Sequence, residues 1–348
     1  MKQHEREYFI SRIRSGVYKI KKDGIQLRIV QPSLEQQYDL NEIYKEAFIS
    51  AVNDDFKTED EMLIWMQEKE LWTDQDHQKL EGLKKDIDKL KIEIYKARNN
   101  TELVEKIRKY LRTAERHLSE QNQKKYTFHE NTCESMASME KSFAFLRMCT
   151  YLNDKLYNFE NIEIDTVFSE YYSMIINEKK IRELARNDPW RSIWSLNEIR
   201  SFNLFSNDKN SELSIDQRNL LIWSKMYDNV YESLDCPADD AIEDDDMLDG
   251  WFLLQKEKRK KEKGEREIEQ ITGNEKIKNS SEIFVMTGSN KKDVDRINSL
   301  NSTTSSEIKK QREKLIKKKG EVSQNEFMDV KVNLNKASNQ KFKGNFRR

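Results

Sequence analysis

The chain has 348 residues, which is long enough for two or three domains. Charged residues make up 36% of it and the mean hydropathy is -0.95, and no run of about 18 apolar residues predicts a membrane span. Only three Pro and nine Gly interrupt a composition rich in Lys, Glu, Leu and Ile, which is typical of long helices.

The net charge of -1 conceals an asymmetry along the chain. Residues 256–348 hold 25 Lys+Arg and 14 Asp+Glu, a net charge of +11, whereas residues 1–255 carry a net charge of -12. This pattern permits self-association, or binding of the basic tail to an acidic partner. The charged N-terminus lacks an apolar signal core, and the three widely spaced cysteines favour a reducing compartment over a disulfide framework.

The first predicted element is a β-hairpin within residues 16–32. Two short strand-like runs flank Asp23 and Gly24, a pair that favours a two-residue turn, and Pro32 ends the second run. A lone hairpin is marginal in water, so this one must pack against another element. Everything after it is predicted to be helical, and a Ser or Thr cap followed by a polar residue three positions later marks four helix starts: Ser33 with Gln36, Thr58 with Glu61, Thr73 with Asp76, and Ser214 with Gln217.

Residues 73–126 carry the strongest periodicity in the chain. Two apolar series with spacings of 3, 4, 3 and 4 residues lie on either side of the polar stretch ARNNT, at residues 97–101. They are Leu80, Leu83, Ile87, Leu90 and Ile94, then Val104, Ile107, Leu111, Ala114 and Leu118. Two such seams predict an antiparallel coiled-coil hairpin, and because its outer faces are charged we expect it to project from the body.

Residues 127–255 are predicted to form an aromatic-rich helical core, with Asp188 and Pro189 at one helix start. The simpler interpretation of the aromatic side chains is that they fill this core. The alternative is a partner groove, because Trp and Tyr favour interfaces. On that alternative the candidate partner-binding residues are Trp190, Trp194, Trp223, Tyr227 and Trp251.

An acidic cluster follows, with Glu243, Asp244, Asp245, Asp246 and Asp249 within seven positions. A calcium loop starting at its second residue would need an oxygen ligand at position 5, Gly at position 6 and Glu at position 12, and all three are absent. Helix capping agrees better with the sequence: the third aspartate of the cluster would cap a helix that ends in Lys and Arg, as the helix dipole favours. Three candidate partner-binding residues come from this cluster: Asp244, Asp245 and Asp246.

The sequence contains none of the phosphate-binding, zinc-protease or serine-nucleophile motifs, and His129 with Cys133 is too small a set for a metal site. We therefore expect no enzyme activity, no metal and no cofactor. Residues 256–348 are predicted to form a largely flexible basic tail with short docking elements, including a short helix at 305–320. Glutamates interleave the basic residues and stacking aromatics are few, so nucleic-acid binding remains only an alternative.

Three stretches together resemble a family of uncharacterised proteins of large tailed bacteriophages that is associated with tail morphogenesis. They are IRELARNDPWRSIWSLNEIRSFNLF (181–205), LSIDQRNLLIWSKMYDNVYESLDCPADDAIEDDDMLDGWF (213–252) and DVDRINSLNSTTSSEIKKQREKLIKKKGEV (293–322). The resemblance spans most of residues 8–330 and implies a chaperone-like tail assembly protein whose partner is a tape-measure protein or another tail or baseplate component. It implies a location in the host cytoplasm or in the virion, and no residue roles.

The sequence thus predicts a mainly α protein: a helical body with a projecting hairpin, an N-terminal β-hairpin and a basic tail. Its expected segments are residues 1–32, 33–72, 73–126, 127–255 and 256–348. The leading hypothesis is a non-enzymatic phage tail assembly chaperone. A structural virion component is the first alternative, and a nucleic-acid-associated factor is the second.

Overall fold

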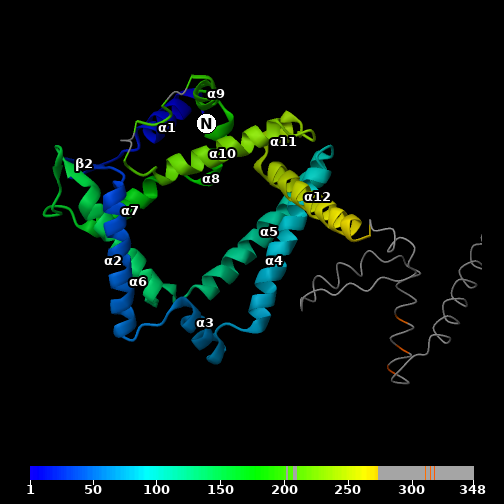
Figure 1. Cartoon of the computed structure of the whole chain (residues 1–348), viewed down its shortest axis with the longest axis horizontal. Coiled ribbons are helices and arrows are strands. Elements are labelled where there is room, and N and C mark those ends of the chain that lie inside the picture. Colours follow the sequence, from blue (N-terminus) through cyan, green and yellow to red (C-terminus); the bar gives the residue numbers. More distant parts are fainter. Residues whose placement is uncertain (201–202, 207–209, 273–309, 311–313, 315–316, 318–348) are drawn as a thin grey trace, which may run out of the picture. The chain divides into compact units, whose positions relative to one another are not determined.

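The computed structural model describes residues 1–200, 203–206 and 210–272, and the single positions 310, 314 and 317. In these residues the chain is mainly helical, as predicted, with one small antiparallel sheet (Figure 1). The chain divides into two units after residue 263, and all the helices and strands named below begin in the first. Most of the predicted flexible tail lies outside the described residues; residues 256–272 continue the last helix, and the single positions 310, 314 and 317 are helical.

The first half of the chain contains α1 (Gln3–Ser15), β1 (Tyr18–Lys22), β2 (Ile25–Ile29), α2 (Leu34–Asn53), α3 (Glu59–Glu68), α4 (Asp74–Lys96), α5 (Thr101–Lys125) and a 3-10 turn, η1 (His129–Asn131). The second half contains α6 (Cys133–Cys149), β3 (Thr150–Leu152), β4 (Lys155–Leu156), α7 (Ile164–Met174), α8 (Glu178–Arg186), α9 (Trp190–Arg200), α10 (Ile215–Tyr231), α11 (Asp239–Glu243) and α12 (Asp245–Thr272).

The four predicted helix caps are all formed. In each, the capping hydroxyl accepts a hydrogen bond from the backbone N–H three residues later, and the side chain of that residue accepts one from the N–H of the cap. These pairs satisfy backbone donors that have no partner inside a helix, which is why short local motifs mark the starts of α2, α3, α4 and α10.

The sheet is larger than the sequence predicts. Strands β1 and β2 form the expected hairpin, with positive φ angles at Asp23 (51°) and Gly24 (79°). Strand β2 also pairs with β3, through Arg28 with Tyr151, and β3 pairs with β4. The prediction that only helices follow the hairpin is therefore wrong at residues 150–156, because strands of two or three residues are too short to show an alternating pattern.

Helices α6 and α7 cover the apolar side of this sheet. The buried cluster contains side chains of the strands, of the two helices and of the connection between β4 and α7: Tyr18, Ile20, Leu27, Ile29, Leu146, Tyr157, Ile162, Val167 and Tyr171. The hairpin thus packs against helices, as its marginal stability requires. Helix α2 packs along α6.

Helices α4 and α5 form the predicted antiparallel hairpin, and Asn100 caps the second helix (Figure 1). Its buried seam consists of Ile87, Ile94, Val104, Ile107 and Leu111. The expectation that the hairpin projects from the body is wrong, because both of its ends contact other elements. Leu80 packs with Met66 and Trp72 at one end, and Met247 of α12 joins the seam near the other.

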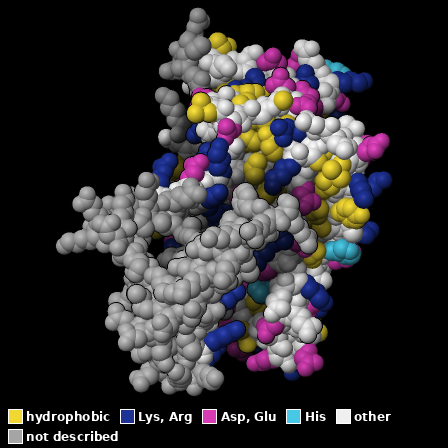
Figure 2. All heavy atoms as spheres, turned by 90° about the vertical axis from the view of Figure 1, so that its right-hand side faces the viewer, with side chains coloured by type: hydrophobic (Ala, Val, Ile, Leu, Met, Phe, Trp, Pro, Cys, Tyr) yellow, Lys and Arg dark blue, Asp and Glu magenta, His cyan; other side chains and the backbone are white. Residues whose placement is uncertain are grey.

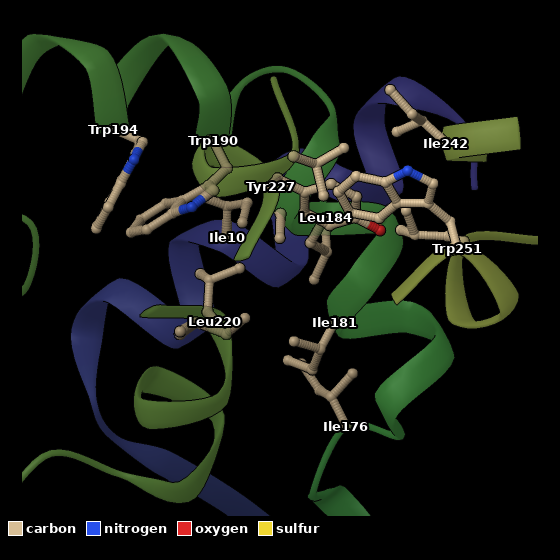
Figure 3. Close-up of a cluster of buried hydrophobic side chains, with 14 residues drawn as sticks. Ile10, Ile176, Ile181, Leu184, Trp190, Trp194, Leu220, Tyr227, Ile242 and Trp251 are labelled. Atoms are coloured by element: carbon tan, nitrogen blue, oxygen red, sulfur yellow. The ribbon is translucent and has the colours of Figure 1, made fainter. Parts of the chain in front are cut away.

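The largest core lies among α1, α8, α9, α10, α11 and the start of α12 (Figure 3). Helix α1 was not predicted; Ile10 and Ile13 are its two buried residues, and both lie in this core. Asp216 of α10 ties α1 and β1 to it, accepting hydrogen bonds from Arg12 (3.2 Å), the Tyr18 hydroxyl (3.0 Å) and the backbone N–H of Ile176 (3.0 Å). This buried carboxylate is fully occupied by structural partners.

Candidate functional site

The acidic cluster begins α12, but its cap is Asp244 rather than the predicted Asp246. One carboxylate oxygen of Asp244 accepts hydrogen bonds from the backbone N–H groups of Asp246 and Met247, each at 3.1 Å. Asp244 has an extended backbone, whereas Asp245 is already helical, so the cap lies two residues earlier than the sequence indicates. The predicted capping role of the cluster is nevertheless confirmed.

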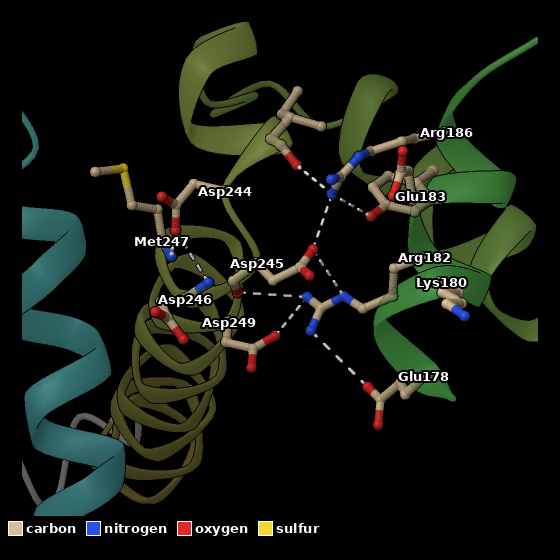
Figure 4. A network of polar contacts seen from close by, with 12 residues as sticks. Glu178, Lys180, Arg182, Glu183, Arg186, Asp244, Asp245, Asp246, Met247 and Asp249 are labelled. Atoms are coloured by element: carbon tan, nitrogen blue, oxygen red, sulfur yellow. Dashed lines mark hydrogen bonds and ion pairs between the residues drawn. The ribbon is translucent and has the colours of Figure 1, made fainter. Parts of the chain in front are cut away.

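On one side of α12, the cluster binds two arginines of α8 (Figure 4). Arg182 is only 5% exposed; it contacts Asp249 at 2.6 Å and Asp245 at 3.4 Å, and its guanidinium lies 4.1 Å from the ring centre of Trp223. Arg186 contacts Asp245 at 2.8 Å. Burial alone would lower the pKa of the Arg182 guanidinium, but the hydrogen bond and charge of Asp249 outweigh it, so the pKa is raised and the cation is retained.

On its other side, α12 binds cations of the α4–α5 hairpin. Lys91 contacts the second oxygen of Asp249 at 2.7 Å, so this carboxylate connects α8 to α4. Arg112 contacts Asp246 at 2.7 Å, and Arg108 pairs with Asp244. In the part of Figure 2 that is not grey, lysines and arginines lie interspersed with acidic and hydrophobic side chains.

A close approach of backbones accompanies these ion pairs. Gly250 is buried, and a Cβ atom at this position would lie 2.0 Å from the carbonyl oxygen of Lys91 and 3.0 Å from Cβ of Tyr95. Only glycine allows α12 to pack this closely on α4. The acidic cluster therefore joins α12 to two neighbours within the chain, and all four aspartates already have cationic partners.

Metal-ligating groups do not gather in the part of the chain that the structure describes: no three His, Cys, Asp or Glu residues are arranged to hold an ion. His129 pairs with Glu59 at 3.3 Å, while the thiol of Cys133 donates to the carbonyl oxygen of Phe56 at 3.2 Å. These two sequence candidates thus have separate partners. Nor, among the described helices, is any both long and apolar enough to cross a membrane.

The candidate aromatic residues come together, but inside the main core (Figure 3). Trp190, Trp194, Tyr227 and Trp251 are buried, and Trp223 lies half-buried under the Arg182 guanidinium. The polar atoms of the three buried tryptophans have partners in the chain: Ser224 (2.7 Å), Asp228 (2.7 Å) and the carbonyl oxygen of Asp235 (3.1 Å). Their packing agrees with the core interpretation, and a role in partner binding stays a prediction.

A different surface presents apolar side chains to solvent. Helix α2 packs one side on α6, yet it leaves Leu34 (66% exposed), Tyr38 (66%), Ile49 (59%) and Val52 (45%) uncovered on another. Their spacings of 4, 11 and 3 residues place all four on one side of the helix, which we call the α2 face. Lys45 lies between the two apolar pairs and binds Glu42 at 2.7 Å.

A shallow hollow of about 580 Å³ lies beside the α2 face, at the contact with α6. Its lining residues are Tyr38, Asn41, Glu42, Tyr44, Lys45 and Lys141. The ammonium of Lys141 donates to the amide oxygen of Asn41 at 2.7 Å and holds the two helices together there. Sequence reasoning missed this surface, although apolar residues on both sides of the 33–53 helix exceed what one buried stripe requires.

Carboxylates follow the α2 face along one side. Glu35, Asp39, Glu42 and Glu46, spaced by 4, 3 and 4 residues, form what we call the α2 acidic edge. Glu42 pairs with Lys45, whereas the other three are exposed and make no ion pair with any residue that the structure describes. An apolar stripe with unneutralised acids beside it is the most distinctive open surface of α2.

Comparisons with known proteins identify no relative of this chain. No family model, no curated protein and no solved structure matches the chain.

Proposed function

We propose that this protein is a non-enzymatic assembly factor of a tailed bacteriophage, which binds helical segments of a tape-measure protein or another tail component. The observation that carries the proposal is the α2 face, with its four exposed apolar side chains on a helix that is itself fixed to α6. A helix lying along such a stripe would bury the side chains that both partners otherwise expose to water.

The internal packing of the chain supports a binding role in a second way. The α4–α5 hairpin, α12 and α8 are held to one another by the ion pairs of the acidic cluster and by the close contact at Gly250. Helix α2 itself is held to α6 by close packing and by the Lys141–Asn41 hydrogen bond, so a partner that meets α2 meets a pre-organised surface, which lowers the entropy lost on binding. The resemblance to phage tail morphogenesis proteins supports the choice of partner.

Co-expression tests this function directly. The tape-measure protein of the same genome should become more soluble with the wild-type chain, and the two should co-purify. Replacing two side chains of the α2 face, as Tyr38→Ser with Ile49→Ser, should remove both effects. The matched control replaces two exposed apolar side chains of the hairpin, Leu103→Ser with Tyr110→Ser, and should leave them intact.

The proposal would be refuted if the tape-measure protein were no more soluble with the wild-type chain than without it and did not co-purify with it. Mass spectrometry of purified particles distinguishes an assembly factor from the main alternative, a structural virion component. A stoichiometric amount of this chain in the virion indicates a structural component, and its absence indicates an assembly factor.

A further inference from the structure

The negative charge of the α2 acidic edge, beside the α2 face, restricts what can bind to this face. The edge residues Glu35, Asp39 and Glu46 are exposed and unpaired among the described residues, and Lys45, the one cation on α2, is engaged by Glu42. An occupant carrying acids or phosphates beside its apolar groups would place like charges together, which opposes binding. An occupant carrying Lys or Arg there would form new ion pairs at the rim of an apolar contact.

The geometry of the stripe adds a spacing requirement. Tyr38 and Ile49 are the inner members of the two apolar pairs, and eleven residues of helix separate them by about 16 Å, at about 1.5 Å per residue. A partner helix that runs along α2 must offer apolar side chains at both places. Three turns of an amphipathic helix meet this requirement, with residues at i, i+3 or i+4, i+7 and i+11 facing α2.

We infer that the α2 face binds an amphipathic helix of another polypeptide whose apolar stripe is flanked by lysine or arginine. This inference rests on the proposed function only in its helix-binding part, and it adds the charge and spacing of the bound segment. Apolar contacts supply most of the affinity, and the acidic edge selects the partner and its orientation.

Fluorescence anisotropy with two labelled peptides provides the test. Both are helical peptides of roughly 20 residues with leucine on one face; one carries lysine on both flanks of that face and the other carries glutamate. The full-length protein should bind the lysine peptide roughly tenfold more tightly, since three exposed ion pairs each change an affinity about two- to threefold. Raising the salt concentration should reduce this preference.

Charge reversal of the α2 acidic edge sharpens the test. The variant E35K/D39K/E46K should prefer the glutamate peptide instead, and the neutral variant E35Q/D39N/E46Q should lose most of the discrimination. The matched control D88K/E93K/E105K changes the net charge equally at exposed positions of the hairpin and should behave like the wild type. Circular dichroism and unfolding temperature establish that each variant is folded.

Equal binding of the two peptides by the wild type, or equal binding of the lysine peptide by the wild type and the reversed variant, would overturn the inference. So would sedimentation showing a wild-type dimer that the reversed variant lacks, because a second copy would then be the occupant. If the protein binds both peptides equally but still makes the tape-measure protein soluble, only this inference is refuted. If it prefers the lysine peptide but does not make the tape-measure protein soluble, only the proposed function is refuted.

Discussion

Replacing Gly250 by alanine should destabilise the protein, although alanine is the better helix former. The added Cβ would lie 2.0 Å from the carbonyl oxygen of Lys91 and 2.7 Å from its carbonyl carbon, and these are backbone atoms that no side-chain rotation can move away. Gly82 offers a matched control in α4, because a Cβ added there meets no atom within 4 Å. The same substitution should therefore change the free energy of unfolding in opposite directions at the two positions.

The magnitudes follow from two competing effects. In a helix interior, alanine is more favourable than glycine by about 1 kcal/mol, and at Gly82 nothing opposes this gain. At Gly250, α12 must move away from α4, and overpacking of this kind costs about 1–3 kcal/mol. The movement also lengthens the ion pair between Lys91 and Asp249. A 2.0 Å approach to backbone atoms belongs to the upper part of that range, about 2–3 kcal/mol, so after the gain of about 1 kcal/mol is subtracted Gly250→Ala should lower the free energy of unfolding by about 1–2 kcal/mol. Gly82→Ala should raise it by about 0.5–1 kcal/mol.

Thermal unfolding followed by circular dichroism measures both changes in the full-length chain. For a unit of this size, 1 kcal/mol corresponds to a shift in Tm of about 2–4 °C, so the two variants should differ by several degrees in opposite directions. Hydrogen exchange of α4 near Lys91 should rise in Gly250→Ala alone. If Gly250→Ala is as stable as the wild type, or gains stability as Gly82→Ala does, α12 does not approach α4 as described.

The remaining predictions concern charge, acid and thiol chemistry. Arg182→Met should lower the free energy of unfolding by about 1–3 kcal/mol because it removes the charge-assisted hydrogen bond that this buried guanidinium donates to Asp249, although Lys91 still neutralises that carboxylate. Arg112→Met, at a pair whose guanidinium is exposed, should cost less than about 1 kcal/mol, and equal losses in urea unfolding would contradict this contrast. Lys124 and the helix cap lower the pKa of the Asp76 carboxyl, so its stabilising contribution is present above the ordinary pKa of about 3.9 and is lost as the pH falls below it. Asp76→Asn should thus lower Tm at neutral pH and match the wild type in strong acid, and a Tm difference that persists in acid would count against this pairing. The exposed thiol of Cys236 should react with a thiol reagent in the folded protein, while the two buried thiols, whose pKa is raised by burial, should react only after unfolding; a fast reaction that survives Cys236→Ser would argue against it.

Local patterns in the sequence predicted much of the fold. The capping boxes involve residues three apart, and the seams of the α4–α5 hairpin repeat every three or four residues, so each pattern is complete within one segment. Strand β3 carries no such signal, because Thr150 and Tyr151 become a strand only through pairing with β2, more than 120 residues earlier. Helix α1 was missed because its apolar residues are too few to show a clear period.

The candidate site was less predictable for the same reason. The sequence indicated that the acidic cluster caps a helix, but the cations that neutralise it lie far away in the chain, from Lys91 in α4 to Arg182 in α8. The α2 face was not predicted for a different reason. Its apolar residues resemble ordinary core positions, and only the fold shows that α6 covers one side of α2 and leaves Tyr38 and Ile49 uncovered.

The two oxygens of Asp249 have a consequence for how the protein opens. One oxygen serves Arg182 of α8 and the other serves Lys91 of α4, so two helices that are distant in sequence depend on a single turn of α12. Fraying of that turn would break both ion pairs at once. The main core and the hairpin should therefore open together as one cooperative unit, rather than as two modules that exchange their protons independently.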